Sequence, residues 1–192
     1  MKYFKSFMVT VLIFTMFFTL FGASKSEAAT SYKKGDILIT TATSYKGIAG
    51  HSAIAISSTS VIHTSGWSTE PYPRIMSIKD WEARYKNKVK VIRPTSSTLG
   101  AKAADQAIKY FKGKTIKYLP TSNPKDIDPY TYCSELVWYA YYKAGKSYQV
   151  NSGATPGNPN GTWKNPSIIY PYDFSNSTYV KHNGFKFIDS TW

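Results

Sequence analysis

The chain contains a single cysteine, Cys133, at the start of a segment with helical spacing, and two histidines, His51 and His63, lie upstream of it. The N–H groups and the positive end of the dipole at a helix start favour a negative sulfur. A neighbouring imidazolium adds to this effect, so we expect a lowered pKa for the Cys133 thiol. The same N–H groups would hold the oxyanion formed when the thiolate attacks a carbonyl. In this hypothesis His51 is the general base and His63 orients it.

Each of these side chains also has an ordinary structural explanation. A lone cysteine at a helix start is often a small buried side chain, and a single histidine is more often a surface or hydrogen-bonded residue than a catalytic one. One cysteine excludes an internal disulfide and a metal site built from several cysteines. We expect no cofactor and no metal.

The elements that must position these residues follow from hydrophobic spacing and turn signals. His51 and His63 flank a short hairpin. They are 12 residues apart, and an even separation places two positions of one continuous strand on the same face. This parity argument is weaker across a hairpin, but neighbouring strands lie only about 4.8 Å apart, so the two histidines could touch. The sequence predicts strands at 33–42, 51–57, 60–64, 88–94 and 179–189, helices at 96–113 and 128–145, and a loop at 150–166. Strands followed by helices predict an α+β domain with a small, mostly antiparallel sheet.

Five short motifs, in this order, resemble the permuted papain-like amidase family. The motifs are "KKGDILIT", "GHSAIAI", a histidine 12 residues later, "YCSEL" and "IIYPYDFSNS", and they extend over residues 33–180. That family, the YiiX-like enzymes, contains circularly permuted relatives of NlpC-type cell-wall peptidases and is related to lecithin:retinol acyltransferase. The resemblance implies a permuted papain-like fold, in which the histidine strands precede the cysteine helix.

The resemblance also implies roles for individual residues. Cys133 matches the nucleophile, His51 the general base and His63 the third polar position. The residues that we consider as lining a substrate site are Tyr132, Tyr45 and Glu135. For the two tyrosines the alternative is ordinary packing, and for Glu135 it is local hydrogen bonding.

The N-terminal residues 1–28 are typical of a secretory signal peptide. Lys2 and Lys5 form a short positive region, residues 7–21 are apolar, and Ser26-Glu27-Ala28 resembles a signal-peptidase site. We expect cleavage after Ala28 or Ala29, a domain over residues 29–192, and a secreted protein, either extracellular or associated with the cell wall. An apolar run of 15 residues is short for a membrane-spanning helix, which needs about 20.

The formal net charge is +13 for the whole chain, and residues 29–192 carry 21 Lys and Arg against 10 Asp and Glu, which is +11. A basic exported protein suits anionic partners, so peptidoglycan and anionic wall polymers are the expected partners and nucleic acid is not. The leading hypothesis is a secreted cysteine amidase that cleaves cell-wall peptides with a Cys-His-His triad. The alternatives are a lipid-directed acyltransferase or N-acyl amide hydrolase, and a non-catalytic wall-binding module. The sequence leaves the oligomeric state open.

Overall fold

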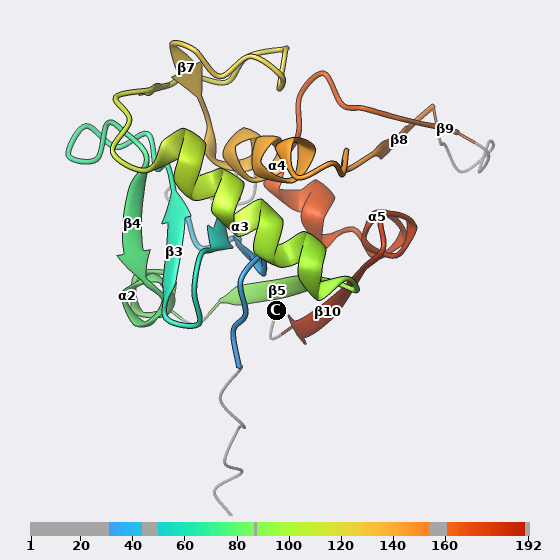
Figure 1. Cartoon of the computed structure of the whole chain (residues 1–192), viewed down its shortest axis with the longest axis horizontal. Coiled ribbons are helices and arrows are strands. Elements are labelled where there is room, and N and C mark those ends of the chain that lie inside the picture. Colours follow the sequence, from blue (N-terminus) through green and yellow to red (C-terminus); the bar gives the residue numbers. More distant parts are fainter. Residues whose placement is uncertain (1–30, 44–49, 87, 154–160, 191–192) are drawn as a thin grey trace, which may run out of the picture. The chain divides into compact units, whose positions relative to one another are not determined.

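A computed structural model describes residues 31–43, 50–86, 88–153 and 161–190. The described residues belong to one compact unit built on a six-stranded sheet (Figure 1). Its order is β10-β5-β1-β2-β3-β4, and every neighbouring pair is antiparallel. The strands are β1 (Ile37–Thr40), β2 (His51–Ala55), β3 (Ser60–His63), β4 (Arg74–Ser77), β5 (Val89–Pro94) and β10 (Phe185–Ser190). The expected α+β class with an antiparallel sheet is confirmed. The predicted signal peptide at 1–28 lies outside the described residues.

Helices and two small strand pairs complete the unit. The helices are α2 (Ile78–Arg84), α3 (Ser97–Phe111), α4 (Cys133–Lys143), α5 (Ser177–His182) and the 3-10 helix η1 (Pro171–Ser175). The pairs are β6 (Lys117–Tyr118) with β7 (Tyr130–Thr131), which are parallel, and β8 (Val150–Ser152) with β9 (Thr162–Lys164), which are antiparallel. Among the described residues, no helix has the length and apolar character needed to cross a membrane.

The two faces of the sheet are buried by different helices. On one face, Ile37 and Ile54 contact a core that includes Ala107 of α3 and Leu136 of α4. In Figure 1, α3 and α4 lie next to each other over this face. On the other face, alternate strand residues such as Ala53 pack in a core with residues of α2. Because side chains alternate along a strand, β2 contributes to both cores and is buried along its whole length.

Helix α4 is the most deeply buried helix of the fold. Its residues from Cys133 to Tyr141 are all buried, so it lacks the polar face of a surface helix. Helix α3 is amphipathic, and its buried residues Ala103, Ala107 and Phe111 recur every four residues. Ser96 caps α3 by accepting a hydrogen bond from the Leu99 N–H at 3.2 Å.

The structure differs from the sequence expectations in several elements. The segment 150–166, expected to be a loop, contains the short strands β8 and β9, which pair with each other. The expected strand at 179–189 is divided, because Asn176 caps the short helix α5 and β10 begins only at Phe185. The expected helix at 128–145 begins at Cys133, and residues 130–131 before it pair as β7. Strand β4 and helix α2 were not predicted, although Ile78, Trp81 and Tyr85 recur at helical spacing and Ser77 is a typical N-cap residue.

A close backbone contact joins the segment before β1 to helix α3. Gly35 has a positive φ of 85°, and a Cβ atom there would lie 2.3 Å from the Cα of Gly100. A Cβ atom added to Gly100 would in turn lie 2.7 Å from the Lys34 carbonyl oxygen. Only two glycines therefore allow this approach, which sets where α3 lies relative to β1.

We expect Gly35→Ala to lower the free energy of unfolding by about 3 kcal/mol, because a left-handed conformation and a backbone overlap both oppose the side chain. Gly113→Ala is the matched control, since Gly113 has a φ of 69° but no atom within 4 Å of the added Cβ. It should cost only about 1 kcal/mol. Urea unfolding measures both values, and equal losses would contradict the importance of the Gly35–Gly100 contact.

Candidate functional site

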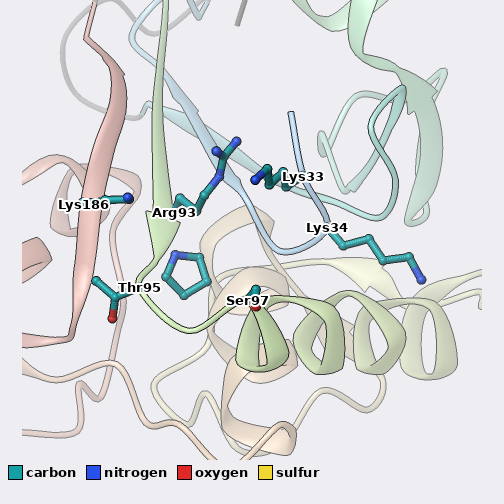
Figure 2. Close-up of a pocket in the computed structure, with 7 residues that line it drawn as sticks. Lys33, Lys34, Arg93, Thr95, Ser97 and Lys186 are labelled. Atoms are coloured by element: carbon teal, nitrogen blue, oxygen red, sulfur yellow. The ribbon is translucent and has the colours of Figure 1, made fainter. Parts of the chain in front are cut away.

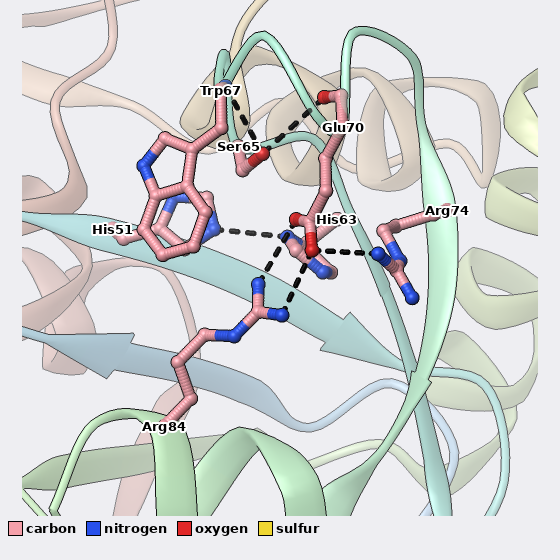
Figure 3. A network of polar contacts seen from close by, with 7 residues as sticks. All are labelled: His51, His63, Ser65, Trp67, Glu70, Arg74 and Arg84. Carbon is pink, nitrogen blue, oxygen red and sulfur yellow. Dashed lines mark hydrogen bonds and ion pairs between the residues drawn. The ribbon is translucent and has the colours of Figure 1, made fainter.

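The imidazoles of His51 and His63 are in direct contact across strands β2 and β3. The pairing of Ile54 with Ile62 and of Ala55 with Val61 sets the register. Continued along β2 and β3, this register places His63 opposite Ala53, so His63 and His51 are diagonal neighbours on one face of the sheet. His51 Nε2 lies 3.0 Å from His63 Nδ1, as drawn in Figure 3. Both side chains are buried.

Aromatic side chains of helix α2 and its end cover this histidine pair. The Trp81 ring stacks on His51 with centroids 5.1 Å apart and meets the His63 ring edge-on at 5.3 Å. The Tyr85 ring lies 5.7 Å from that of His51. The covering rings remove the imidazoles from water on the α2 face of the sheet.

Burial keeps both histidines neutral. Desolvation lowers the pKa of His51 well below its ordinary value, and the nearby His63 and Arg84 lower it further, while Glu70 opposes them. Desolvation, with Arg84 and Arg74, lowers the pKa of His63 to about 3. A neutral imidazole can accept a proton. If His51 carries its hydrogen on Nε2 and donates it to His63 Nδ1, then His51 Nδ1 is the nitrogen that can act as a base.

An ion-pair network lies beside the histidines (Figure 3). Glu70 accepts two hydrogen bonds from Arg84, at 2.8 and 2.9 Å, and one from Arg74 at 2.6 Å. The Arg84 guanidinium also lies over the Trp67 ring, 4.9 Å from its centroid. Sequence analysis did not find this network. The i, i+4 spacing of Glu70 and Arg74 was the only local signal, and Arg84 is brought to Glu70 by helix α2.

Cys133 is the first residue of helix α4. It is only 3% exposed, and the side chain of the N-cap residue Tyr132 makes no capping hydrogen bond. The Tyr118 hydroxyl donates to the Cys133 sulfur at 3.9 Å, and the backbone N–H of Ser52 also stabilises a negative sulfur. The thiol therefore lies against the start of β2, beside the residue that follows His51.

The electrostatics of Cys133 differ from the sequence expectation. Burial raises the pKa of the Cys133 thiol, and the donors Ser52, Tyr118 and Ser134 offset this only in part. The expected lowering relied on a helix start and an imidazolium, but the structure removes the thiol from water and leaves both imidazoles neutral. The resting state is therefore a thiol next to a neutral histidine pair and not a thiolate–imidazolium ion pair.

Different elements bring His51 and Cys133 to the start of β2. Helix α4 places the Cys133 sulfur beside the Ser52 N–H, and the His51 ring stacks on Trp81 of α2. Tyr85 lies near both groups: its ring is 5.7 Å from that of His51, and its pKa, raised mainly by burial, is raised further by Cys133. Among the described residues, the hydrogen-bond partner of the sulfur is Tyr118 and that of His51 is His63. Hydrogen bonds between catalytic groups are often long in the free enzyme and shorten when substrate binds.

The three residues considered for substrate binding have different positions. The Tyr132 hydroxyl is buried and accepts a hydrogen bond from the Ile169 N–H at 3.0 Å, which favours a packing role. The Glu135 side chain is also buried and accepts a hydrogen bond from Thr121 at 3.0 Å, which favours local hydrogen bonding. Tyr45 lies outside the described residues. No cluster of three or more potential metal ligands occurs within the described ranges.

Comparison with known proteins places the chain in a family. The family model described as "Lipoprotein N-acylation protein LnsA-like" matches residues 2–155, which include Cys133, His51 and His63. The chain belongs to this family. The description of this family names lipoprotein N-acylation, which is closer to the lipid-directed alternative than to a cell-wall amidase.

A curated relative of this LnsA-like protein is the "Uncharacterized 30.3 kDa protein" of Bacillus thuringiensis. The two are 34% identical over 128 residues, which is 62% of this chain and 47% of the relative. The chain thus spans about half the length of that relative. No solved structure matches the chain.

The alkylation rate of Cys133 should rise with pH, with a midpoint above the free-thiol pKa of about 8.5. The reason is that burial, the largest influence on its pKa, favours the neutral thiol. Iodoacetamide labelling followed by mass spectrometry measures the rate, and Cys133→Ser is the blank because the chain has no other cysteine. Tyr118→Phe should move the midpoint higher. A midpoint below the free-thiol value would show that the thiol is activated in the resting state.

The Glu135 carboxyl should make stability depend on pH. Burial raises its pKa from 4.5 to about 7, and the hydrogen bond from Thr121 offsets this only in part. The folded state therefore holds the proton more tightly than the unfolded state, and stability falls as pH rises from about 4.5 through 7. Between pH 5 and pH 8 this carboxyl should lower the free energy of unfolding by about 2 kcal/mol, and Glu135→Gln should abolish that decrease. Urea unfolding of both proteins at pH 5 and pH 8 measures it, and parallel losses in the two proteins would contradict this role.

Proposed function

We propose that the protein is a cysteine acyltransferase that moves an acyl chain from a lipid ester to an amine. In this proposal Cys133 is the nucleophile, His51 the general base and His63 the residue that positions His51. The observation that carries the proposal is the family match over residues 2–155, because its description names N-acylation and its range contains all three residues. N-acylation of a lipoprotein joins an acyl group to an amine, so an amine of a lipoprotein is the proposed acceptor.

The first step forms a thioester. His51 Nδ1 takes the proton of the Cys133 thiol as the sulfur attacks the carbonyl carbon of the lipid ester. The carbon–oxygen bond to the lipid alcohol then breaks, and the imidazolium returns the proton to the departing oxygen. The products are an acyl-thioester on Cys133 and a lipid with a free hydroxyl group.

The second step transfers the acyl group. The acceptor amine attacks the thioester carbonyl, the carbon–sulfur bond breaks, and His51 moves a proton from the amine to the sulfur. The products are an amide and the regenerated thiol. If water attacked instead, the acyl group would be lost as a free fatty acid, so transfer requires that water is excluded. The burial of Cys133, His51 and His63 supports this requirement.

Polar groups around the pair support both steps. The pKa of the Tyr118 hydroxyl is raised, mainly by burial, so it stays protonated and can donate to the oxygen of a tetrahedral intermediate. His63 Nδ1 can accept the Nε2 hydrogen of His51 and so hold its tautomer. The Glu70 carboxylate raises the pKa of His51 and would stabilise its imidazolium, although Arg84 opposes it.

The site of action and the partners are also part of this proposal. The signal-like residues 1–28 support export, and the charge of +11 over residues 29–192 supports work at an anionic surface. A lipid donor and a lipoprotein acceptor would both be found at the outer face of a membrane. Cleavage of wall peptides would use the same thiol and imidazoles with water as acceptor, and it is an outcome that the test below distinguishes.

We expect purified protein to convert a phospholipid and a peptide with a free N-terminal amine into an N-acylated peptide, detected by mass spectrometry. Cys133→Ala and His51→Ala should reduce the product to background, because each removes a group that takes part in both steps. His63→Ala should lower kcat/KM by roughly 10²-fold or less, since general acid–base catalysis is worth about 10²–10⁴-fold and His63 only positions the base. His63→Asn or His63→Gln should restore part of the loss, because an amide oxygen can still accept from His51.

Circular dichroism of each variant controls for folding. Full activity of His51→Ala would contradict the assigned base, and equal loss in His51→Ala and His63→Ala would contradict the positioning role. The same preparation could instead release peptides from peptidoglycan fragments and form no N-acylated peptide. That result would contradict acyl transfer and support the amidase hypothesis.

A further inference from the structure

A basic pocket lies at the end of the sheet remote from Cys133, as drawn in Figure 2. Its volume is about 350 Å³. The wall is formed by the segment before β1, the end of β5, the start of α3 and the start of β10. The lining residues are Lys33, Lys34, Arg93, Pro94, Thr95, Ser97 and Lys186. Three of the four cationic residues of the pocket are exposed lysines, so the pocket is open to solvent on the side where they lie.

The pocket has more positive than negative charge. Arg93 is paired with the buried Asp36 through two hydrogen bonds of 2.6 Å, and Lys34 is paired with Asp105 at 3.1 Å. The Lys33 backbone N–H donates to the Asp36 carboxylate at 2.8 Å, but the side-chain ammonium groups of Lys33 and Lys186 have no carboxylate partner among the described residues. Two unneutralised ammonium groups therefore face one pocket whose other cations are already paired.

Of the two hydroxyl groups that line the pocket, that of Ser97 has a hydrogen left to donate to an oxygen of an anion. Thr95 donates its hydroxyl hydrogen to the Gly184 carbonyl at 2.9 Å, while Ser97, the first residue of α3, also lines the pocket. The first turn of α3 contains no acidic residue, so no carboxylate compensates the positive end of its dipole. The helix start adds to a field that is set mainly by the lysines.

The pocket is separate from the proposed reaction site. His51 pairs with Thr40 at the end of β1, whereas Arg93 follows Ile92, the partner of Ile37 at the beginning of β1. The two sites therefore lie at opposite ends of the same strand. The role of the pocket does not depend on whether the protein transfers acyl groups.

We propose that this pocket binds a phosphate group, with Lys33 and Lys186 as the residues that contact it. A phosphate oxyanion provides the charge that two lysines lack and has several acceptor oxygens for ammonium and hydroxyl donors. A soluble phosphate and the phosphate of a lipid head group share this chemistry. An open pocket admits a head group while the rest of the lipid stays outside.

The test compares two double variants of the full chain, both with the same change in net charge. Lys33→Glu with Lys186→Glu alters the pocket. Lys112→Glu with Lys114→Glu is the control, because both lysines are exposed and lie just beyond the other end of α3. Circular dichroism verifies that each protein is folded. The apolar segment 7–21 is common to all proteins, so its effect on lipid binding cancels.

Two ligands distinguish the sources of phosphate. Calorimetric titration at low salt measures binding of inorganic phosphate, and cosedimentation measures binding to phosphatidylglycerol vesicles relative to phosphatidylcholine vesicles. The pocket variant should weaken binding roughly 30-fold, because each lysine contributes roughly fivefold. The control variant should weaken it much less. If the pocket variant loses binding only to vesicles, the ligand is a lipid head group. If it loses binding only to inorganic phosphate, the ligand is a soluble phosphate. Either result supports the proposal. Equal weakening by the two variants, or no binding of either ligand by the unaltered chain, would overturn it.

Discussion

The diagonal contact between His51 and His63 is the interaction on which the candidate site depends. It exists because β2 and β3 pair in one register, and a shift by one residue would move one imidazole to the other face of the sheet. Trp81 closes this face and removes both rings from water. Burial then keeps both imidazoles uncharged, which is the state that a base needs before it accepts a proton.

The same removal of water changes the character of the thiol. Helix α4 is buried from Cys133 to Tyr141. Water therefore cannot solvate a thiolate at its first residue, as it would at an exposed helix start. In the proposed mechanism, the raised pKa of Cys133 means that the thiolate and the imidazolium form only during the reaction. Exclusion of water would then protect the proposed thioester from hydrolysis, which a transferase needs and a hydrolase does not. The Glu70–Arg84 ion pair then provides charge close to the base without direct contact with the thiol.

Strand β1 connects two chemically different ends of the sheet. At its end, Thr40 pairs with His51 in an apolar and aromatic environment. Before its start, Asp36 is buried and held by Arg93, and the lysines around this ion pair remain at the surface. The Gly35–Gly100 contact brings α3 onto this end and so forms one wall of the basic pocket. Positive charge therefore collects where the chain is exposed, and the candidate reaction site lies where it is dry.

The sequence by itself determined the elements with a strong period: the strands around His51 and His63, helix α3, and the helix that follows Cys133. It indicated that the two histidines could touch, because they flank a short hairpin, but only the register of β2 and β3 placed them on one face. It did not reveal the Glu70–Arg84 pair, since these residues are 14 positions apart and meet only when α2 folds back over the sheet. The direction of the Cys133 pKa shift was also decided by the tertiary structure, because a pKa depends on how much water the packed elements exclude, and no local pattern of residues records that exclusion.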